Sequence, residues 1–460
     1  MKNKLPIVID LMPAQADGSN GGNLLFIINL IKFMQEAIKN PIIIICKREK
    51  KTFLEESLSF DNPNYEFKEI KILDSYQKAM MLLHPDGAGL ISPILFKSSS
   101  ILATVVIRLL GNINTIENRA SRKYSSLINH SNTIFEKVAL KLFFIGVIIT
   151  RKCSNQLKST KKNVPHSDIK AILFSPFGHF DSIAPRFKRI VSIIYDLQHI
   201  DLPFMFSAKE IDTRNFHYSK IINFSSNVIT ISNFSKQRIS NNFGIKDDHI
   251  KVIHLPPQIT KNNDGLEPKI KKDFADLQLN KAIKEGNFFF VPANFWKHKN
   301  HKTLLVAINM FTRINQDITF IFSGKFTSCE KKEFDDFSRF NNLNKRVWIL
   351  GYIDSNSIEF LYRQCLAVIS PSLYEGFGMT LVEAKFYCKV SIVSNIMAHK
   401  ETADTAATIF FDPRNPKDIL EKLIFFVNSD KKNYTFNKVI NPKEVYQEYT
   451  NCIVGETLEF

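Results

Sequence analysis

The chain has 460 residues, which is too long for one ordinary hydrophobic core and predicts two domains. With 44% hydrophobic and 23% charged residues the composition is globular, which excludes a disordered chain. Six scattered cysteines without a C-x-x-C pair argue against a zinc site and a disulfide framework and suit reduced thiols. The formal net charge of +16 could serve nucleic acid, an anionic membrane face or solubility. No zinc finger, RNP motif or basic helix supports nucleic acid, so the last two readings stay open.

Two segments bear on location. The start, MKNKLPIVIDLMPAQ, has no signal-peptide apolar region, so we expect a cytoplasmic protein. The longest apolar run, residues 142–149, is shorter than the about 20 residues that span a bilayer. It predicts a core helix or, as the alternative, an interfacial helix on the inner face of the cytoplasmic membrane.

The first half of the chain alternates strand-like and helix-like segments. Residues 6–11 (PIVIDL) predict a buried strand, and a glycine-containing loop leads to a helix over 23–37. This order opens a doubly wound α/β domain. Ser232 stands where a helix N-cap belongs, before residues 234–239. Further strands are expected at 41–46, 171–174, 190–195, 227–231 and 251–254.

A polar, charged stretch at 261–285 predicts an interdomain linker, and a second α/β pattern follows it. Its helices are expected at 302–315, 331–340 and 379–387, and its strands at 287–292, 318–322, 347–350, 367–369, 390–394 and 408–411. Two Rossmann-like halves joined by a linker are therefore predicted.

The segment SPSLYEGFGMTLVEA, residues 370–384, carries the strongest chemical signal. Its glycines allow close backbone approach before a helix begins, and a helix N-terminus favours phosphate. Glu375 and Glu383 would repel phosphates, so they more plausibly accept hydrogen bonds from sugar hydroxyls. Taken alone, two glutamates eight residues apart are a weak signal.

The longer segment LGYIDSNSIEFLYRQCLAVISPSLYEGFGMTLVEA closely resembles the donor-site segment of glycosyltransferase family 4. By that resemblance Glu375 binds hydroxyls of the transferred sugar and Glu383 binds the ribose hydroxyls of the nucleotide. The turn that lines the sugar and diphosphate would comprise Gly376, Phe377, Gly378, Met379 and Thr380.

A second patch, VPANFWKHKNHKTL at 291–304, looks like the strand, loop and helix with which this family places a basic pair on the diphosphate. Lys299 falls on the family's lysine, whereas Asn294 stands in place of its arginine. A neutral amide can still donate to phosphate but brings no charge. Lys297, His298 or His301 could supply the missing charge.

A third patch, IYDLQHIDLPFMF at 194–206, resembles the family's acceptor-side H-D-L-x-H loop, with Tyr195 in place of the first histidine. The resemblance makes Asp196 and His199 candidates for acceptor positioning or proton transfer. A structural histidine is the alternative, and His179 is a second candidate.

Weaker agreement comes from three other places. VITISNFSKQRI (228–239) is like the family's strand-serine-helix segment, and Glu401, in HKETADTAA, has a structural or a ligand role. Gly21 and Gly22 resemble the glycine loop that closes over the donor phosphates, or form a plain tight turn. Residues 50–170 match poorly, and acceptor recognition is expected there.

Together these observations predict an α/β chain with the GT-B fold, two doubly wound Rossmann-like domains facing each other across a cleft. Residues 1–260 would form an acceptor-binding domain, residues 286–440 a nucleotide-sugar-binding domain, and residues 441–460 a helix packing back on the first domain. The resemblance implies a retaining, metal-independent hexosyltransferase, with no cofactor. It would use a GDP- or UDP-sugar and a glycan or polyprenyl-linked acceptor in bacterial O-antigen, capsule or other surface polysaccharide synthesis.

The alternatives left open are an inverting GT-B transferase and a degenerate subunit with a binding or scaffold role. An oxidoreductase is disfavoured because no G-x-G-x-x-G follows the first strand.

Overall fold

The computed structural model describes residues 5–11, 22–38, 40–46, 51–58, 70–73, 169–177, 187–258, 277–437 and 441–455. The described residues, Ile169 apart, belong to one compact unit. Gly21, His179, the apolar run 142–149 and most of the 50–170 segment lie outside the described residues. None of the helices within those ranges is long and apolar enough to span a bilayer.

The N-terminal domain is built on a seven-stranded sheet in the order β3-β2-β1-β4-β5-β6-β7. Its central strands are runs of four buried residues, IVID and IIII, which is typical of parallel strands covered on both faces. The strands are β1 (Ile7–Asp10), β2 (Ile42–Ile45), β3 (Ile70–Leu73), β4 (Ile169–Ser175), β5 (Phe187–Ile193), β6 (Asn227–Thr230) and β7 (Ile250–Val252).

The helices of this domain include several that the sequence pattern did not predict. Helix α8 begins with a capping box formed by Ser207 and Glu210, and α9 is capped by Ser232, as predicted. The helices are α1 (Gly22–Ala37), α2 (Lys51–Leu58), α7 (Gln198–Asp201), α8 (Ala208–Phe224) and α9 (Asn233–Phe243), with short 3-10 turns η4 (Pro203–Met205) and η5 (Asp247–His249).

The C-terminal helix α18 (Pro442–Val454) packs on this first sheet domain. Its Tyr449 ring lies against Phe26 of α1, with ring centroids 4.8 Å apart, and its hydroxyl donates to the carbonyl of Ile253 at 3.0 Å. Arg189 of β5 donates to the carbonyls of Cys452 and Ile453, so it satisfies groups that a helix C-terminus leaves unpaired.

The C-terminal domain has a six-stranded sheet in the order β10-β9-β8-β11-β12-β13, and every neighbouring pair is parallel. The strands are β8 (Phe288–Pro292), β9 (Thr319–Ser323), β10 (Val347–Ile349), β11 (Ala367–Ser370), β12 (Val390–Ser394) and β13 (Thr408–Phe411). The helices are α11 (Leu277–Glu285), α12 (His301–Phe311), α13 (Ser328–Phe340), α14 (Ser355–Gln364), α15 (Met379–Phe386), α16 (Met397–Thr402) and α17 (Pro416–Asn428). Three short 3-10 turns complete it: η6 (Lys297–Lys299), η7 (Thr405–Ala407) and η8 (Lys431–Asn433).

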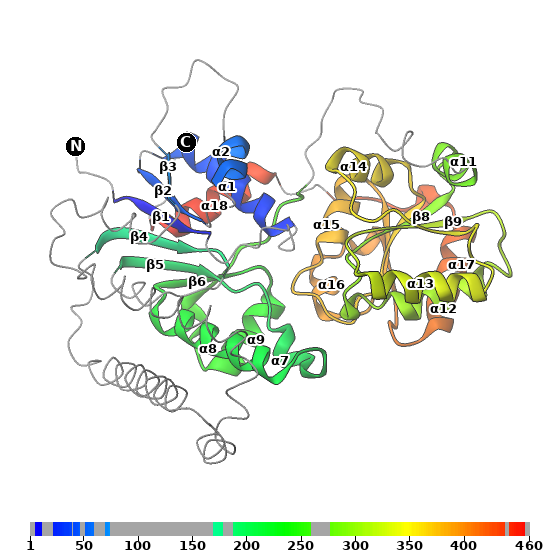
Figure 1. Ribbon diagram of the computed structural model, residues 1–460, viewed down its shortest axis with the longest axis horizontal. Coiled ribbons are helices and arrows are strands. Elements are labelled where there is room, and N and C mark those ends of the chain that lie inside the picture. Colours follow the sequence, from blue (N-terminus) through cyan, green and yellow to red (C-terminus); the bar gives the residue numbers. More distant parts are fainter. Residues whose placement is uncertain are drawn as a thin grey trace, which may run out of the picture. The chain divides into compact units, whose positions relative to one another are not determined.

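Alternating side chains of β8 build two cores, one on each face of this sheet. Phe289 packs with α12, α13 and α17, whereas Phe288 and Phe290 pack with α11, α14 and α15. Figure 1 shows these two groups of helices on either side of β8 and β9. Helix α11 lies within the predicted linker, but its buried Leu279 and Ile283 belong to the second domain's core. Two doubly wound Rossmann-like domains, as predicted, make up the described chain.

Candidate nucleotide-sugar site

The strand order of the C-terminal sheet creates a switch point between β8 and β11. The chain leaves β8 toward β9 on one side and leaves β11 toward β12 on the other. Open α/β sheets bind ligands outside the carboxyl ends of the strands at such a point. The loops that start here, residues 293–300 and 371–378, contain most of the residues predicted to hold the donor.

These two loops are joined by hydrogen bonds. Asn300, held in the left-handed region at φ 57°, donates from its side-chain amide to the carbonyls of Pro371 (3.0 Å) and Pro413 (2.7 Å). The backbone N–H of Leu373 donates to the carbonyl of His298 at 2.7 Å. Side chains on either loop are thereby held at fixed positions relative to each other.

Lys299 and Glu375 form an ion pair across this junction. Lys299 Nζ lies 2.6 Å from Glu375 Oε1, and each side chain is only 16% exposed. The hydroxyl of Ser372 donates to the same carboxylate oxygen at 2.6 Å. Sequence reasoning placed both charged residues in the donor site but did not predict that they pair or that Ser372 contacts them.

At neutral pH the largely buried charges at this junction are those of Lys299 and Glu375, because the pKa values of the neighbouring histidines are lowered. Burial tends to raise the pKa of Glu375, but the charge of Lys299, with smaller contributions from His298 and His399, outweighs it and holds the pKa at about 2. Burial and the neighbouring Lys299 lower the pKa of His298 to about 4, and the same causes lower that of His301 to about 3. Both histidines are neutral at pH 7 and bring no charge to compensate for Asn294.

Asn294 serves the fold of the neighbouring loop. Its side-chain oxygen accepts from the backbone N–H of Lys325, just after β9, at 2.8 Å. The backbone N–H of Phe295 in turn donates to the carbonyl of Lys325 at 2.9 Å. The side chain at this position therefore bridges two loops at the carboxyl edge of the sheet.

The glycine turn before α15 needs its glycines. Gly378 has φ +117°, and a Cβ there would lie 2.8 Å from Thr402 Oγ1. The carbonyl of Gly376 accepts from Ser232 Oγ at 2.6 Å, and a Cβ on Gly376 would meet Tyr195 and Asp196. Met379 and Thr380 then open α15, whose first N–H groups have no partner within the helix. The turn thus presents main-chain donors beside Lys299 and Glu375.

Glu383 lies one turn further along α15 and is held from α14. Tyr362 donates from its hydroxyl to Glu383 Oε2 at 2.7 Å. Burial raises the pKa of Glu383 to about 7, although the hydrogen bond from Tyr362 and the charge of Lys299 act in the opposite direction. The sequence analysis did not identify Tyr362 as a contact of Glu383; its only signal was its place, after Leu361, in the segment that resembles the family.

On the N-terminal domain, Asp196 and His199 follow β5 but have different surroundings. Asp196 lies beside Gly376 and accepts from the N–H of Gln198 at 2.9 Å, and burial raises its pKa. His199 is fully buried, its Nε2 lies 3.0 Å from the side-chain oxygen of Asn215 in α8, and burial lowers its pKa. Gly22 is the first residue of α1, after β1.

Glu401, predicted to have a structural or a ligand role, contacts the start of helix α9. Its carboxylate accepts from the N–H groups of Asn233 (2.6 Å) and Phe234 (2.9 Å) at the start of α9. Burial tends to raise its pKa, but these bonds and the one from His254 lower it to about 2. An anion at a helix N-terminus is stabilising, which fits the structural role.

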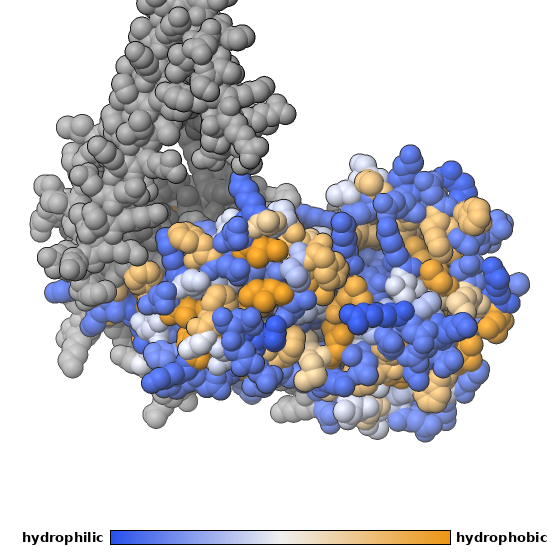
Figure 2. Space-filling view, turned by 90° about the horizontal axis from the view of Figure 1, so that it is seen from below, coloured by the Kyte–Doolittle hydropathy of each residue, from blue (hydrophilic) through white to orange (hydrophobic). Residues whose placement is uncertain are grey.

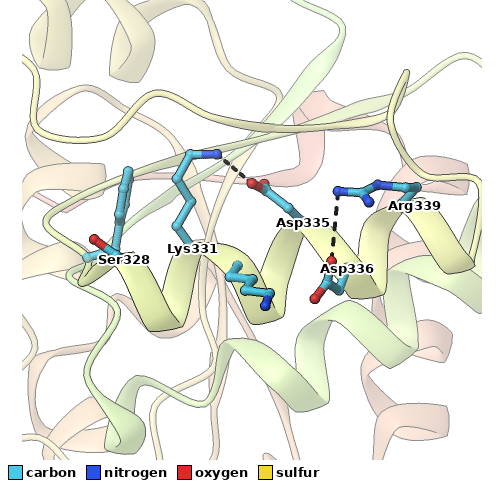
Figure 3. A pocket seen from close by; sticks show the side chains of 7 residues that line it. Ser328, Lys331, Asp335, Asp336 and Arg339 are labelled. Carbon is cyan, nitrogen blue, oxygen red and sulfur yellow. Dashed lines mark hydrogen bonds and ion pairs between the residues drawn. The ribbon is translucent and has the colours of Figure 1, made fainter.

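A separate hollow lies along α13 and shares no residue with this site. Four of its charged groups form two ion pairs, Lys331 with Asp335 and Arg339 with Asp336 (Figure 3). It is lined by Phe326, Ser328, Lys331, Lys332, Asp335, Asp336 and Arg339. Among the described residues no group of three or more His, Cys, Asp or Glu could hold a metal ion.

Residues 273–439 match the family model of "Glycosyl transferases group 1". The O-antigen chain mannosyltransferase RfbU of Salmonella typhimurium is 24% identical over 190 residues, covering 41% of this chain and 48% of that protein. The chain spans about half the length of the curated relatives it matches. The matched region contains Lys299, Glu375 and Glu383.

Two solved structures cover nearly the whole chain. WaaG, a glycosyltransferase involved in lipopolysaccharide biosynthesis, has a TM-score of 0.56 at 9% identity, covering 98% of this chain and all (100%) of that one. Anabaena Alr3699/HepE, in complex with UDP and glucose, has a TM-score of 0.53 at 15% identity, covering 99% of this chain and 96% of that one. The predicted GT-B fold is thereby confirmed.

Proposed function

We propose that this protein is a glycosyltransferase that moves a hexose-type sugar from a nucleotide diphosphate donor to a glycan or polyprenyl-linked glycan. The observation that carries the proposal is the buried Lys299–Glu375 pair at the β8/β11 switch point, beside the glycine turn that opens α15. The match of residues 273–439 to group 1 glycosyl transferases supports it from an independent direction.

Each group of the site has a definite task in this proposal. Lys299 and the main-chain N–H groups of Gly376, Phe377 and Gly378 bind the donor phosphates and stabilise the charge that develops on the leaving diphosphate. Glu375, ionised at any pH well above 2, accepts from sugar hydroxyls, and Glu383 accepts from the ribose. Because Glu375 already neutralises Lys299, the incoming diphosphate competes with Glu375 for that ammonium group.

The proposal includes a reaction with retention of configuration and without a metal. Lys299 and the helix N-terminus supply the positive potential that a divalent cation supplies in other transferases. Asn294 brings no charge, so donor affinity depends more heavily on Lys299 than it would with an arginine there. Assay of the transferred sugar's anomeric configuration would distinguish retention from the inverting alternative.

The acceptor side gives the degenerate-subunit alternative its support. His199 is buried and bonded to Asn215, so it reaches a reacting hydroxyl only after a change in side-chain conformation. Asp196, beside Gly376, is the better placed of the two predicted acceptor-side residues. Incubation of the purified chain with labelled nucleotide sugars separates the alternatives: donor hydrolysis or transfer supports an enzyme, and binding without either supports the degenerate subunit.

We place the reaction in the synthesis of a bacterial surface polysaccharide. The similarity to an O-antigen chain mannosyltransferase favours a mannose-type sugar and hence a GDP-linked donor. A UDP-linked donor is the alternative, supported by the UDP-bound structure of similar fold. A panel of GDP- and UDP-sugars tested for protection against thermal unfolding decides between them, because only the bound nucleotide raises the transition temperature.

A peripheral contact with the anionic inner-membrane surface fits such an acceptor. The formal charge is +16, and the rings of Phe204 (76%) in η4 and Phe216 (57%) in α8 are exposed. Lys220 Nζ is 4.3 Å from the Phe216 ring centroid. Figure 2 shows hydrophobic groups among hydrophilic ones on one face. Sedimentation with anionic but not zwitterionic vesicles would support this contact, and equal sedimentation with both would contradict it.

A further inference from the structure

We propose that Tyr362 is a positioning residue of the donor site, which fixes the Glu383 carboxylate for the ribose hydroxyls of the nucleotide. This inference rests on the proposed function. It assigns a task to a side chain that contacts no ligand in the proposal and acts through its hydrogen bond to Glu383.

The geometry gives Tyr362 little freedom. Its ring is fully buried, stacks on Tyr387 with centroids 5.4 Å apart, and meets the edge of Phe290 at 5.2 Å. With the ring held on both sides, the hydroxyl occupies one position, 2.7 Å from Glu383 Oε2. Because an ionised carboxylate only accepts, the hydroxyl donates to it, and Oε1 is left for a ligand hydroxyl.

The same contact controls the charge of Glu383. The titratable groups that face it are Tyr362 from α14, Lys299 from the loop after β8, and Tyr387 at the end of its own helix. Burial raises the pKa of Glu383 to about 7, and the hydrogen bond from Tyr362 keeps it from rising further. Near neutral pH, the carboxyl is therefore partly protonated before a ligand arrives.

A nucleotide whose ribose hydroxyls donate to Glu383 binds best to the ionised form. Binding must then strengthen as the pH rises through about 7 and must release a proton near neutral pH. Loss of the Tyr362 hydroxyl raises the pKa of Glu383, so the pH at which binding becomes strong moves upward.

Tyr362→Phe tests the inference, with Tyr387→Phe as the matched control. The Tyr387 hydroxyl is buried without a hydrogen-bond partner among the described residues, so its removal leaves the Glu383 contact intact. GDP and UDP are titrated by calorimetry between pH 6 and pH 9, in two buffers of different ionisation enthalpy. At pH 7 we expect Tyr362→Phe to bind roughly tenfold more weakly, with affinity recovering toward pH 9, and the control to match the unsubstituted chain.

Two results would overturn the role of Tyr362: unchanged affinity of Tyr362→Phe at every pH, or a loss that is equal at all pH values. Stability without nucleotide gives a second measurement. Because the folded-state pKa of Glu383 exceeds its ordinary 4.5, stability falls as the pH rises from that value through about 7. In Tyr362→Phe the fall should continue to higher pH. If it does and neither nucleotide binds the unsubstituted chain, the donor site is refuted while the Tyr362–Glu383 coupling stands.

Discussion

Replacement of Lys299 by methionine tests the electrostatics of the site independently of any substrate. Methionine keeps much of the side chain's length but removes the ammonium group that lies 2.6 Å from Glu375 Oε1. Glu375 then keeps the hydrogen bond from Ser372 and the smaller effects of His298 and His399, but it loses the largest influence that opposes its burial. The pKa of Glu375 therefore rises, and the folded state at neutral pH contains a poorly compensated buried carboxylate.

The magnitude follows from the pKa of Glu375 and from the cost of breaking buried pairs. A carboxyl whose pKa is about 2 instead of 4.5 contributes roughly 3 kcal/mol of stability. Removal of one partner of a buried pair costs about 3 to 5 kcal/mol, because the other charge stays desolvated. In the native chain this contribution is present above pH 4.5 and is lost as the pH falls toward about 2. In Lys299→Met the pH dependence of this contribution has the opposite sign, because protonation of Glu375 removes the uncompensated buried charge and stabilises the folded variant.

Urea unfolding followed by tryptophan fluorescence measures this domain selectively. The chain has two tryptophans, Trp296 and Trp348, and both lie in the C-terminal domain. We expect Lys299→Met to lose about 3 kcal/mol at pH 8 and clearly less at pH 5, and Lys299→Met with Glu375→Gln to regain part of the loss. Because the charge of Lys299 also lowers the pKa of Glu383, its loss raises that pKa further and adds to the destabilisation at pH 8. An equal loss at both pH values, with additive effects in the double variant, would refute the reasoning.

Four further outcomes are expected. Glu383→Ala should weaken nucleotide binding, measured by calorimetry, by about tenfold or more. Glu375→Ala should leave binding equal or tighter, because Lys299 is freed, and should mainly slow sugar transfer. Equal effects of the two substitutions on binding and on transfer would show that the assignment is wrong. Gly378→Ala should destabilise the domain by about 1 to 3 kcal/mol in the same urea assay, since φ +117° and the nearby Thr402 both oppose a Cβ. Asn294→Arg should tighten nucleoside diphosphate binding several-fold, and no gain in calorimetry would remove the charge argument. Chelation with EDTA should leave transfer unchanged, and a loss restored by Mg²⁺ would contradict the metal-independent proposal.

The sequence predicted elements well wherever the signal is local. Short buried runs such as IVID and IIII became central parallel strands, and Ser232 caps α9. Helix α8 was missed because its apolar residues show no clear period, although Ser207 and Glu210 form a capping box that would have marked its start. Helix α11 was read as a linker segment because charged residues separate its buried apolar ones.

Pairings between distant residues could not be read from local pattern. Lys299 and Glu375 are 76 positions apart, and they meet because β8 and β11 are neighbours in the sheet. Tyr362 and Glu383 meet because α14 and α15 pack on the same face of that sheet. Strand order and helix placement are tertiary properties. The residue types of the site could therefore be predicted from the sequence, whereas their partners and pKa values required the structure.

The central claim is that an anionic leaving group binds at the β8/β11 switch point of the C-terminal sheet. A crystal structure of the protein with GDP or UDP tests it most directly. We predict density for the diphosphate within hydrogen-bonding distance of Lys299 Nζ and the main-chain N–H groups of residues 376–378, with the ribose at Glu383. A nucleotide bound elsewhere, with the Lys299–Glu375 pair and the glycine turn unoccupied, would contradict the claim.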